Sequence, residues 1–404
     1  MSRTRERRLR FFLVGTEFFR SYGGIQYVNR LLVRALCEMG LRTPLDLEVF
    51  SYIDGPEHFP AEMPGARAVR WFGAERRRGE LAWQLTRRLT AARPDLVLFT
   101  HVSLAPLGEL VRRLAPGARV AVLAHGTEVW SPLEARVARF LPRIDSFVSP
   151  SAFTAQKLAD LHAIPGEKIT VIPHGLDPDW MLDAGNAPEK RPASNGDSGS
   201  ALLSVTRLSR ADREGKGIDL VLQALPSLLD RYPGIRYRIV GGGGDLPRLA
   251  GIVSKLGMDS RVELAGARRE DALKQAYSEA DIFVLPTQVE GFGIVFLEAM
   301  YNRLPVVAAC ASAVPEVVED GVTGLLAAPG NVGELSAALA SLLADSELRG
   351  SMGEAGRSRV ERLYSFERFA ARWERWMAAQ VPEVLYAARQ TAAFTRAQAA
   401  AGAA

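Results

Sequence analysis

The sequence predicts an α/β protein built from two doubly wound parallel-sheet domains that face each other across a cleft. Its 404 residues exceed what one hydrophobic core usually serves, so two domains are expected. Short apolar runs alternate with helical segments in both halves, which is the pattern of parallel sheets covered on both faces. Between the halves, residues 183–200 are rich in Ala, Gly, Asn, Pro, Ser and charge, a composition typical of a linker.

The first half contains five apolar runs with the length of strands, separated by helical segments. The predicted strands are Leu9–Gly15, Leu47–Tyr52, Asp95–Thr100, Val120–His125 and Ser146–Ser149. The basic start of the chain followed by Phe11-Phe-Leu-Val has too short an apolar run for a secretory leader and lacks a small-residue cleavage site. We therefore expect this run to form the first strand.

The alternation restarts after the linker. The predicted strands are Ala201–Arg207, Tyr237–Gly241, Val262–Gly266, Ile282–Pro286 and Pro305–Ala309, with helices near 217–231, 245–257, 270–279, 293–302 and 333–345. A last amphipathic helix is expected at Ser365–Ala379, with large aromatic residues on one face. Ligands of such sheets bind beyond the carboxyl ends of the strands, so the loops there are where a site is expected.

Composition excludes several classes of protein. The chain has 48% hydrophobic and 24% charged residues, as ordinary globular proteins do. The two cysteines, Cys37 and Cys310, lie in unlike contexts without a metal spacing, which favours a reduced, cytoplasmic compartment. The five histidines are scattered along the chain, and no apolar stretch approaches the 18 residues of a membrane span.

The most informative stretch runs from Leu285 to Met300. It reads as the end of a buried strand, a glycine-punctuated loop and a helix that begins near Gly293, whose free N–H groups stabilise an anion such as a phosphate. Two acids, Glu290 and Glu298, would lie about 12 Å apart on a helix, too far for a glycosidase pair. The spacing suits an elongated ligand with hydroxyls at both ends and a diphosphate between them, as in a nucleotide sugar.

The motif Glu290-x7-Glu298 within EGFGIVFLEAM, preceded by DIFVLP and followed by Arg303-Leu-Pro-Val-Val, resembles the signature of family 4 of the retaining, nucleotide-sugar-dependent glycosyltransferases. The resemblance implies the GT-B fold, with two Rossmann-like domains and a last helix that crosses back to the first. It also implies transfer of a sugar from a nucleoside-diphosphate sugar to an acceptor hydroxyl of a glycan, a lipid-linked molecule or a small molecule.

Site residues follow from matching this sequence to the family. Glu290 would bind the sugar and Glu298 the ribose, while His125 in Ala124-His-Gly-Thr-Glu128 would contact the donor sugar. Arg207 and Lys216 would stabilise the diphosphate as its negative charge rises, although Arg210 or Arg213 can take one of these roles. The remaining donor-binding candidates are Gly23, Gly24, Arg268, Gly291, Phe292, Gly293 and Ile294. Relatives usually carry Gly-Gly where this chain has Ser312-Ala313, which puts the usual donor geometry there in doubt.

The predicted domains are an acceptor-side domain at residues 1–182, a linker at 183–200 and a nucleotide-sugar-binding domain at 201–365. A crossover helix at 366–385 and an Ala-rich tail at 386–404 follow. No cofactor and no metal are expected, because no grouped acids or histidines suggest a divalent ion. Gly241–Gly244 lacks the full dinucleotide fingerprint, so hydride transfer is a poor interpretation. A nucleotide-sugar 2-epimerase and a non-catalytic sugar-nucleotide-binding protein stay open as alternatives.

Net positive charge of +4 arises in the first half of the chain. Arginines cluster at 76–78, 87–88 and 112–113, and a predicted helix at Glu75–Arg93 places leucines on one face. These arginines are either the solvated side of a core-facing helix or a peripheral contact with an anionic membrane or lipid acceptor. Nucleic acid is not an expected partner, since the basic residues lack interleaved aromatic platforms.

Overall fold

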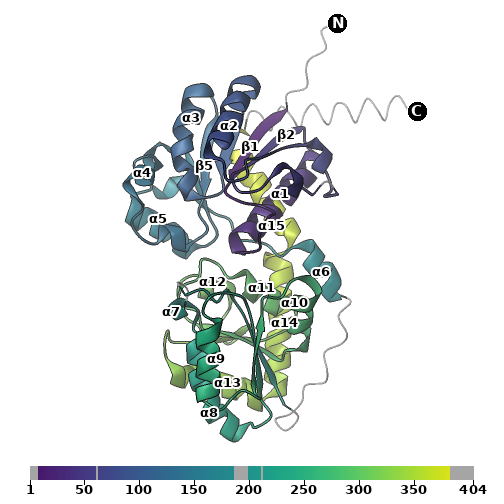
Figure 1. The fold of residues 1–404 in the computed structure, drawn as a ribbon. Coiled ribbons are helices and arrows are strands. Elements are labelled where there is room, and N and C mark those ends of the chain that lie inside the picture. Colours follow the sequence, from purple (N-terminus) through teal and green to yellow (C-terminus); the bar gives the residue numbers. More distant parts are fainter. Residues whose placement is uncertain (1–7, 61, 186–198, 211–212, 383–404) are drawn as a thin grey trace, which may run out of the picture. The chain divides into compact units, whose positions relative to one another are not determined.

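The computed structural model describes residues 8–60, 62–185, 199–210 and 213–382. The described residues form two compact units, one from residues 8–174 together with 366–382, the other from residues 175–365 (Figure 1). The division falls at residue 174 rather than 182. Residues 186–198 of the predicted linker and the whole predicted tail lie outside the described residues.

The first unit contains a seven-stranded, all-parallel sheet with strand order β3-β2-β1-β4-β5-β6-β7. Its strands are β1 (Leu9–Gly15), β2 (Leu45–Ser51), β3 (Val69–Gly73), β4 (Leu96–Phe99), β5 (Arg119–Leu123), β6 (Ser146–Ser149) and β7 (Ile169–Val171). Its α-helices are α1 (Gly24–Gly40), α2 (Arg78–Ala92), α3 (Gly108–Leu114), α4 (Ala135–Ala138), α5 (Ala152–His162) and α15 (Phe366–Gln380).

Both faces of this sheet are covered. Phe12 and Val14 of β1 share a buried cluster with the leucines of α2, while the intervening Phe11 and Leu13 are equally buried. The last helix, α15, packs against α1, as Figure 1 shows, and buries Trp373. The aromatic face predicted for this helix is therefore a packing face.

The second unit contains a six-stranded parallel sheet with order β10-β9-β8-β11-β12-β13. Its strands are β8 (Ala201–Val205), β9 (Arg236–Val240), β10 (Val262–Gly266), β11 (Ile282–Leu285), β12 (Val306–Ala309) and β13 (Gly324–Ala327). Its α-helices are α6 (Pro178–Gly185), α7 (Arg213–Lys216), α8 (Ile218–Arg231), α9 (Leu246–Lys255), α10 (Glu270–Glu279), α11 (Ile294–Tyr301), α12 (Val314–Val317), α13 (Val332–Ala344) and α14 (Ser346–Leu363).

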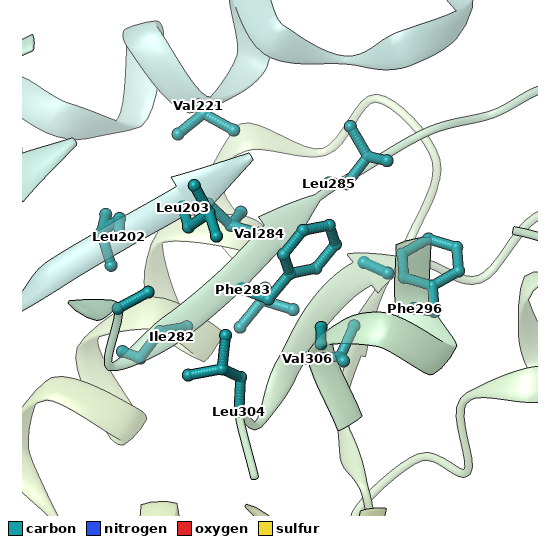
Figure 2. Packing of buried hydrophobic residues seen from close by; sticks show 14 of the residues in the cluster. Leu202, Leu203, Val221, Ile282, Phe283, Val284, Leu285, Phe296, Leu304 and Val306 are labelled. Atoms are coloured by element: carbon teal, nitrogen blue, oxygen red, sulfur yellow. The ribbon is translucent and has the colours of Figure 1, made fainter. Parts of the chain in front are cut away.

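Central strand β11 organises the core of this unit. Its four residues are all buried, and Figure 2 shows Phe283 of this strand among side chains from neighbouring strands and from α11. Phe283 meets Phe296 of α11 edge to face, with ring centroids 5.9 Å apart. This packing fixes α11 against the sheet and therefore fixes the loop that joins β11 to it.

The fold class predicted from the sequence is confirmed, with corrections at the level of elements. Three strands were missed, β3, β7 and β13, and all three are sheet edges. Arg207 does not end β8, since it lies two residues beyond that strand, and Lys216 closes the short helix α7 rather than opening a helix. No helix in the described parts of the chain is both long and apolar enough to cross a membrane.

Candidate functional site

The loop from β11 to α11 depends on glycine at its last position. Strand β11 ends at Leu285, and α11 begins at Ile294 with Gly293 as its N-cap, at a φ of 91°. A Cβ at Gly293 would lie 2.4 Å from the ring of Phe296 and 3.2 Å from the side chain of Glu290. The predicted helix start is thus confirmed, and only glycine fits it.

A second segment holds this loop from one side. The carbonyl of Gly215 accepts hydrogen bonds from the Gln288 amide at 2.8 Å and the Thr287 hydroxyl at 2.9 Å. The next residue, Lys216, places its Nζ 2.9 Å from Oε2 of Glu290, with both side chains about four-fifths buried. The structure therefore pairs two predicted site residues that lie far apart in the sequence.

The glycine-rich turn after β9 supports the backbone around Arg207. A Cβ at Gly241 would lie 1.8 Å from the Thr206 carbonyl oxygen, and one at Gly243 would lie 2.0 Å from that of Leu208. These glycines therefore allow close backbone packing, which explains them without a dinucleotide. The backbone of Arg207 lies between these two close approaches, at Thr206 and Leu208, and its side chain is exposed.

Arg207 and Lys216 line one small pocket of the second unit, together with Asp245 and Arg248. Arg248 bonds to both carboxylate oxygens of Asp219, at 2.9 and 3.0 Å, and to both of Asp245. These two acids raise the pKa of the Arg248 guanidinium and compensate its charge. Sequence reasoning missed this network, although Asp245 directly follows the glycine-rich turn.

Glu298, the second acid of the motif, lies in a different environment. It is 7% exposed, and its Oε2 accepts a hydrogen bond from the Tyr277 hydroxyl at 2.7 Å. Burial raises the pKa of Glu298 to about 7 against an opposing effect of the tyrosine hydrogen bond. The same burial, followed by the charge of Glu298, raises the pKa of Tyr277. Sequence reasoning missed Tyr277 as well.

The remaining candidates of the second unit are Gly291, Phe292, Ile294 and Arg268. Gly291 is buried, and the Phe292 side chain packs against Tyr364 with ring centroids 5.7 Å apart, so that Phe292 serves the core. Ile294 is half-buried in the first turn of α11. Arg268 is exposed and lies two residues beyond the end of β10.

In the first unit, Gly23 caps α1 and Gly24 is its first residue. A Cβ at Gly24 would meet nothing within 4 Å, so packing inside the described protein does not require glycine there. Buried Asp54 holds the preceding loop, because its carboxylate accepts hydrogen bonds from the amides of residues 18–20 at 2.7 to 3.0 Å. Asp54 therefore fixes the backbone of the loop, and the position where a side chain of residue 24 would lie is open.

His125 lies two residues beyond β5, at a carboxyl end as predicted. Its Nε2 donates a hydrogen bond to the Thr100 carbonyl at 2.7 Å, which leaves Nδ1 as an acceptor. This buried Nδ1 has no hydrogen-bond partner among the described residues. The backbone N–H of His125 donates to Oε1 of Glu128 at 2.5 Å, so the acid of the motif holds the turn.

Three histidines gather in this unit, contrary to the impression of scatter given by the sequence. The ring of His125 lies 6.5 Å from that of His101 and 6.3 Å from that of His174. Burial lowers the pKa of all three below the ordinary 6.5, so each is neutral near pH 7. The available signal was that each follows a strand of one parallel sheet, whose carboxyl ends meet at one edge.

In the part of the chain that the structure describes, no group of three or more His, Cys, Asp or Glu side chains is arranged to hold a metal ion. The chemistry available within the second unit is that of cations and a helix N-terminus beside two acids. In the first unit it is that of neutral imidazoles.

Two solved structures resemble this chain over 92% of its length. One is sucrose-phosphate synthase from Thermosynechococcus elongatus, with a TM-score of 0.73, 20% identity and coverage of 92% of this chain and 99% of that chain. The other is the Anabaena protein HepE in complex with UDP and glucose, with a TM-score of 0.71, 19% identity and coverage of 92% and 100%. At these identities the likeness shows the shared fold, the two-domain GT-B architecture.

Sequence comparison is more specific. Residues 22–180 match the profile of glycosyltransferase family 4, and residues 189–359 match that of glycosyl transferases group 1. The chain is 30% identical over 384 residues to the GDP-mannose-dependent alpha-(1-6)-phosphatidylinositol monomannoside mannosyltransferase of Mycobacterium tuberculosis, covering 90% of this chain and 96% of the relative. The chain therefore belongs to glycosyltransferase family 4 and is a glycosyltransferase.

Proposed function

We propose that this glycosyltransferase transfers a hexosyl group from a nucleoside-diphosphate sugar to an acceptor hydroxyl, with retention of the anomeric configuration and without a bound metal ion. The observation that supports this most is the Lys216–Glu290 pair, 2.9 Å apart, beside the start of α11. It brings a cation, an acid and free helix N–H groups together, as a sugar diphosphate requires.

The diphosphate leaving group gains negative charge as the glycosidic bond breaks. Arg207 and Lys216 line one pocket, and fixed cations stabilise that developing charge more than they stabilise the bound substrate. These cations replace a divalent ion in the proposal. Loss of turnover on adding a chelator, with recovery on adding a divalent ion, contradicts this part.

Retention in the proposal comes from attack by the acceptor on the face that the nucleotide leaves, so that no protein nucleophile is required. Glu290, paired with Lys216, binds the sugar and does not attack the anomeric carbon. A phosphate oxygen then accepts the acceptor's proton. His125 contributes its Nδ1 lone pair as an acceptor for a sugar hydroxyl.

A lipid-linked acceptor is the first to test, because the Mycobacterium tuberculosis relative is named for a phosphatidylinositol monomannoside substrate. The basic patch on α2 supports contact with an anionic membrane. Trp83 is 57% exposed, with the Arg87 guanidinium 5.1 Å from its ring centroid, and Arg76 and Arg78 are exposed nearby in the sequence. An aromatic ring flanked by cations suits a lipid headgroup region.

The experiment is a thermal-shift comparison of GDP-mannose, UDP-glucose and related donors, followed by transfer assays with the donor that stabilises the protein most. Transfer with an unchanged anomeric configuration is expected, and inversion contradicts the proposal. Formation of an isomeric nucleotide sugar without acceptor indicates the epimerase instead. Donor binding without any transfer indicates the non-catalytic alternative.

A further inference from the structure

Ser312 lies in a backbone conformation that L-amino acids rarely adopt. Its φ is 47°, in the left-handed region that favours glycine, and it follows the carboxyl end of β12 in the second unit. A non-glycine residue stays in such a conformation when the surrounding contacts determine it. The hydroxyl of Ser312 forms hydrogen bonds with the loop that carries Glu290.

One hydroxyl group makes two of these contacts. Oγ of Ser312 accepts a hydrogen bond from the Glu290 amide at 3.0 Å and donates one to the Gln288 carbonyl at 3.2 Å. The amide of the next residue, Ala313, donates to the Glu290 carbonyl at 3.2 Å. The backbone of Glu290 is thus held at both its N–H and its C=O by residues 312 and 313.

The opposite side of the loop is held by Gly215 and Lys216, through the Gln288 amide and the Glu290 carboxylate. Glu290 is therefore fixed by its backbone from Ser312 and by its side chain from Lys216. An alanine or a glycine at position 312 removes the two hydrogen bonds of the Ser312 hydroxyl and leaves the Ala313 amide and Lys216 in place.

We propose that Ser312 is a positioning residue that acts through Glu290, presenting its carboxylate to the sugar of the donor. The inference rests on the proposed function, because it assigns the sugar end of the donor to Glu290. Ser312 holds the sugar end of the site only. The ribose end at Glu298 is fixed separately, by Tyr277.

Two variants separate this role from a general effect on folding. Ser312→Ala removes both hydrogen bonds and keeps the positive φ, whereas Ser312→Gly removes the bonds and relieves the strain. Both are expected to lower kcat/KM for sugar transfer by about tenfold. Binding of the nucleoside diphosphate alone is expected to change less than about twofold, because that ligand lacks the sugar.

Two control variants reproduce the two chemical changes, loss of a serine hydroxyl and relief of a positive φ, away from the Glu290 loop. Ser341→Ala removes a serine hydroxyl that donates to a backbone carbonyl on exposed α13, and Ala163→Gly relieves a positive φ of 51° in the first unit. Neither is expected to change transfer. In a double-mutant cycle with Glu290→Ala, Ser312→Ala is expected to have no further effect on transfer, since its effect passes through Glu290.

Hydrogen exchange of the peptide spanning residues 286–291 tests whether Ser312 holds this loop, and the measurement does not depend on enzymatic activity. Ser312→Ala is expected to accelerate exchange there, and unchanged exchange overturns the proposal. Additive losses in the cycle, or equal losses of transfer and of nucleoside-diphosphate binding, overturn it as well. Failure of the wild type to use any nucleotide sugar overturns the proposed function instead, and the exchange result still decides whether Ser312 holds the loop.

Discussion

At the scale of single residues, the two glutamates of the motif occupy contrasting environments. The negative charge of Glu290 is compensated by Lys216, whereas Glu298 is buried and accepts a hydrogen bond from the Tyr277 hydroxyl. Their spacing was readable from the sequence. Their partners were not, because Lys216 and Tyr277 reach them through tertiary packing, and neither position has a local signature.

Glu298 makes the stability of the protein depend on pH. Burial raises its pKa from 4.5 to about 7, so the folded protein binds this proton more tightly than the unfolded chain does. The contribution to stability is fully present below pH 4.5 and is lost as the pH rises through about 7. Glu298→Gln is expected to remove this pH dependence. The unfolding free energy of the wild type minus that of Glu298→Gln is therefore expected to fall by on the order of 3 kcal/mol between pH 5 and pH 8.

Urea denaturation of wild type and Glu298→Gln at several pH values measures this difference. Comparison of the two proteins also cancels the opposite effect of His101, His125 and His174, whose lowered pKa values reduce stability as the pH falls below 6.5. Exposed Glu347→Gln is the control. A difference that stays constant across this range contradicts the assignment of the raised pKa to Glu298.

At the scale of elements, the start of α11 depends on one glycine. Gly293 and Gly257 both have positive φ values, 91° and 65°, but a Cβ at Gly257 meets nothing within 4 Å. Gly257→Ala is expected to cost about 1 kcal/mol of backbone strain, and Gly293→Ala about 2 kcal/mol more, because it also clashes with Phe296 and Glu290. Thermal melts compare the two, and equal losses contradict this account of the helix start.

Helix α2 is attached to the first sheet by a buried charge. Glu48 of β2 is 2% exposed and bonds to Arg88 of α2, with a second contact from Arg70. Arg88→Ala is expected to lower the unfolding free energy by about 2 to 4 kcal/mol, because it leaves a buried carboxylate undercompensated. Arg87→Ala, the exposed neighbour, is expected to cost less than about 1 kcal/mol. Denaturant titration distinguishes them, and similar values for both refute the buried attachment.

The elements that the sequence predicted are those with continuous apolar runs. Inner strands β1 and β6 match their predicted bounds, since residues buried on both faces leave a clear pattern. Edge strands β3 and β7 are partly exposed, so their pattern is weaker. Helix α14 was missed because its surface is rich in charge, although it packs against α11.

At the scale of the whole molecule, the basic first unit has fewer available charges than the sequence suggested. Arg88, Arg112 and Arg113 are engaged by acids, which leaves the cluster around Trp83 on α2 as the proposed membrane contact. Sedimentation with anionic vesicles at low salt is expected to be reduced severalfold in Trp83→Ala and Arg87→Ala, and to weaken with added salt. Wild-type protein that stays in the supernatant contradicts the contact.

The GT-B architecture and the acid motif were predictable because they depend on periodicity and on one local signature. The hydrogen bonds between Ser312 and the Glu290 loop, the Arg248 network and the histidine cluster were not predictable. Each of them joins residues from separate strand ends or loops. Parallel sheets bring such loops to one edge, but the sequence does not say which side chains meet there.

The most direct test of the proposed donor site is the Glu290→Ala variant, assayed with the nucleotide sugar that stabilises the wild type most. Calorimetry measures binding of the nucleoside diphosphate, and a transfer assay measures turnover. The account predicts that turnover falls by at least about a hundredfold while nucleoside-diphosphate binding persists. Turnover that survives intact in Glu290→Ala contradicts it.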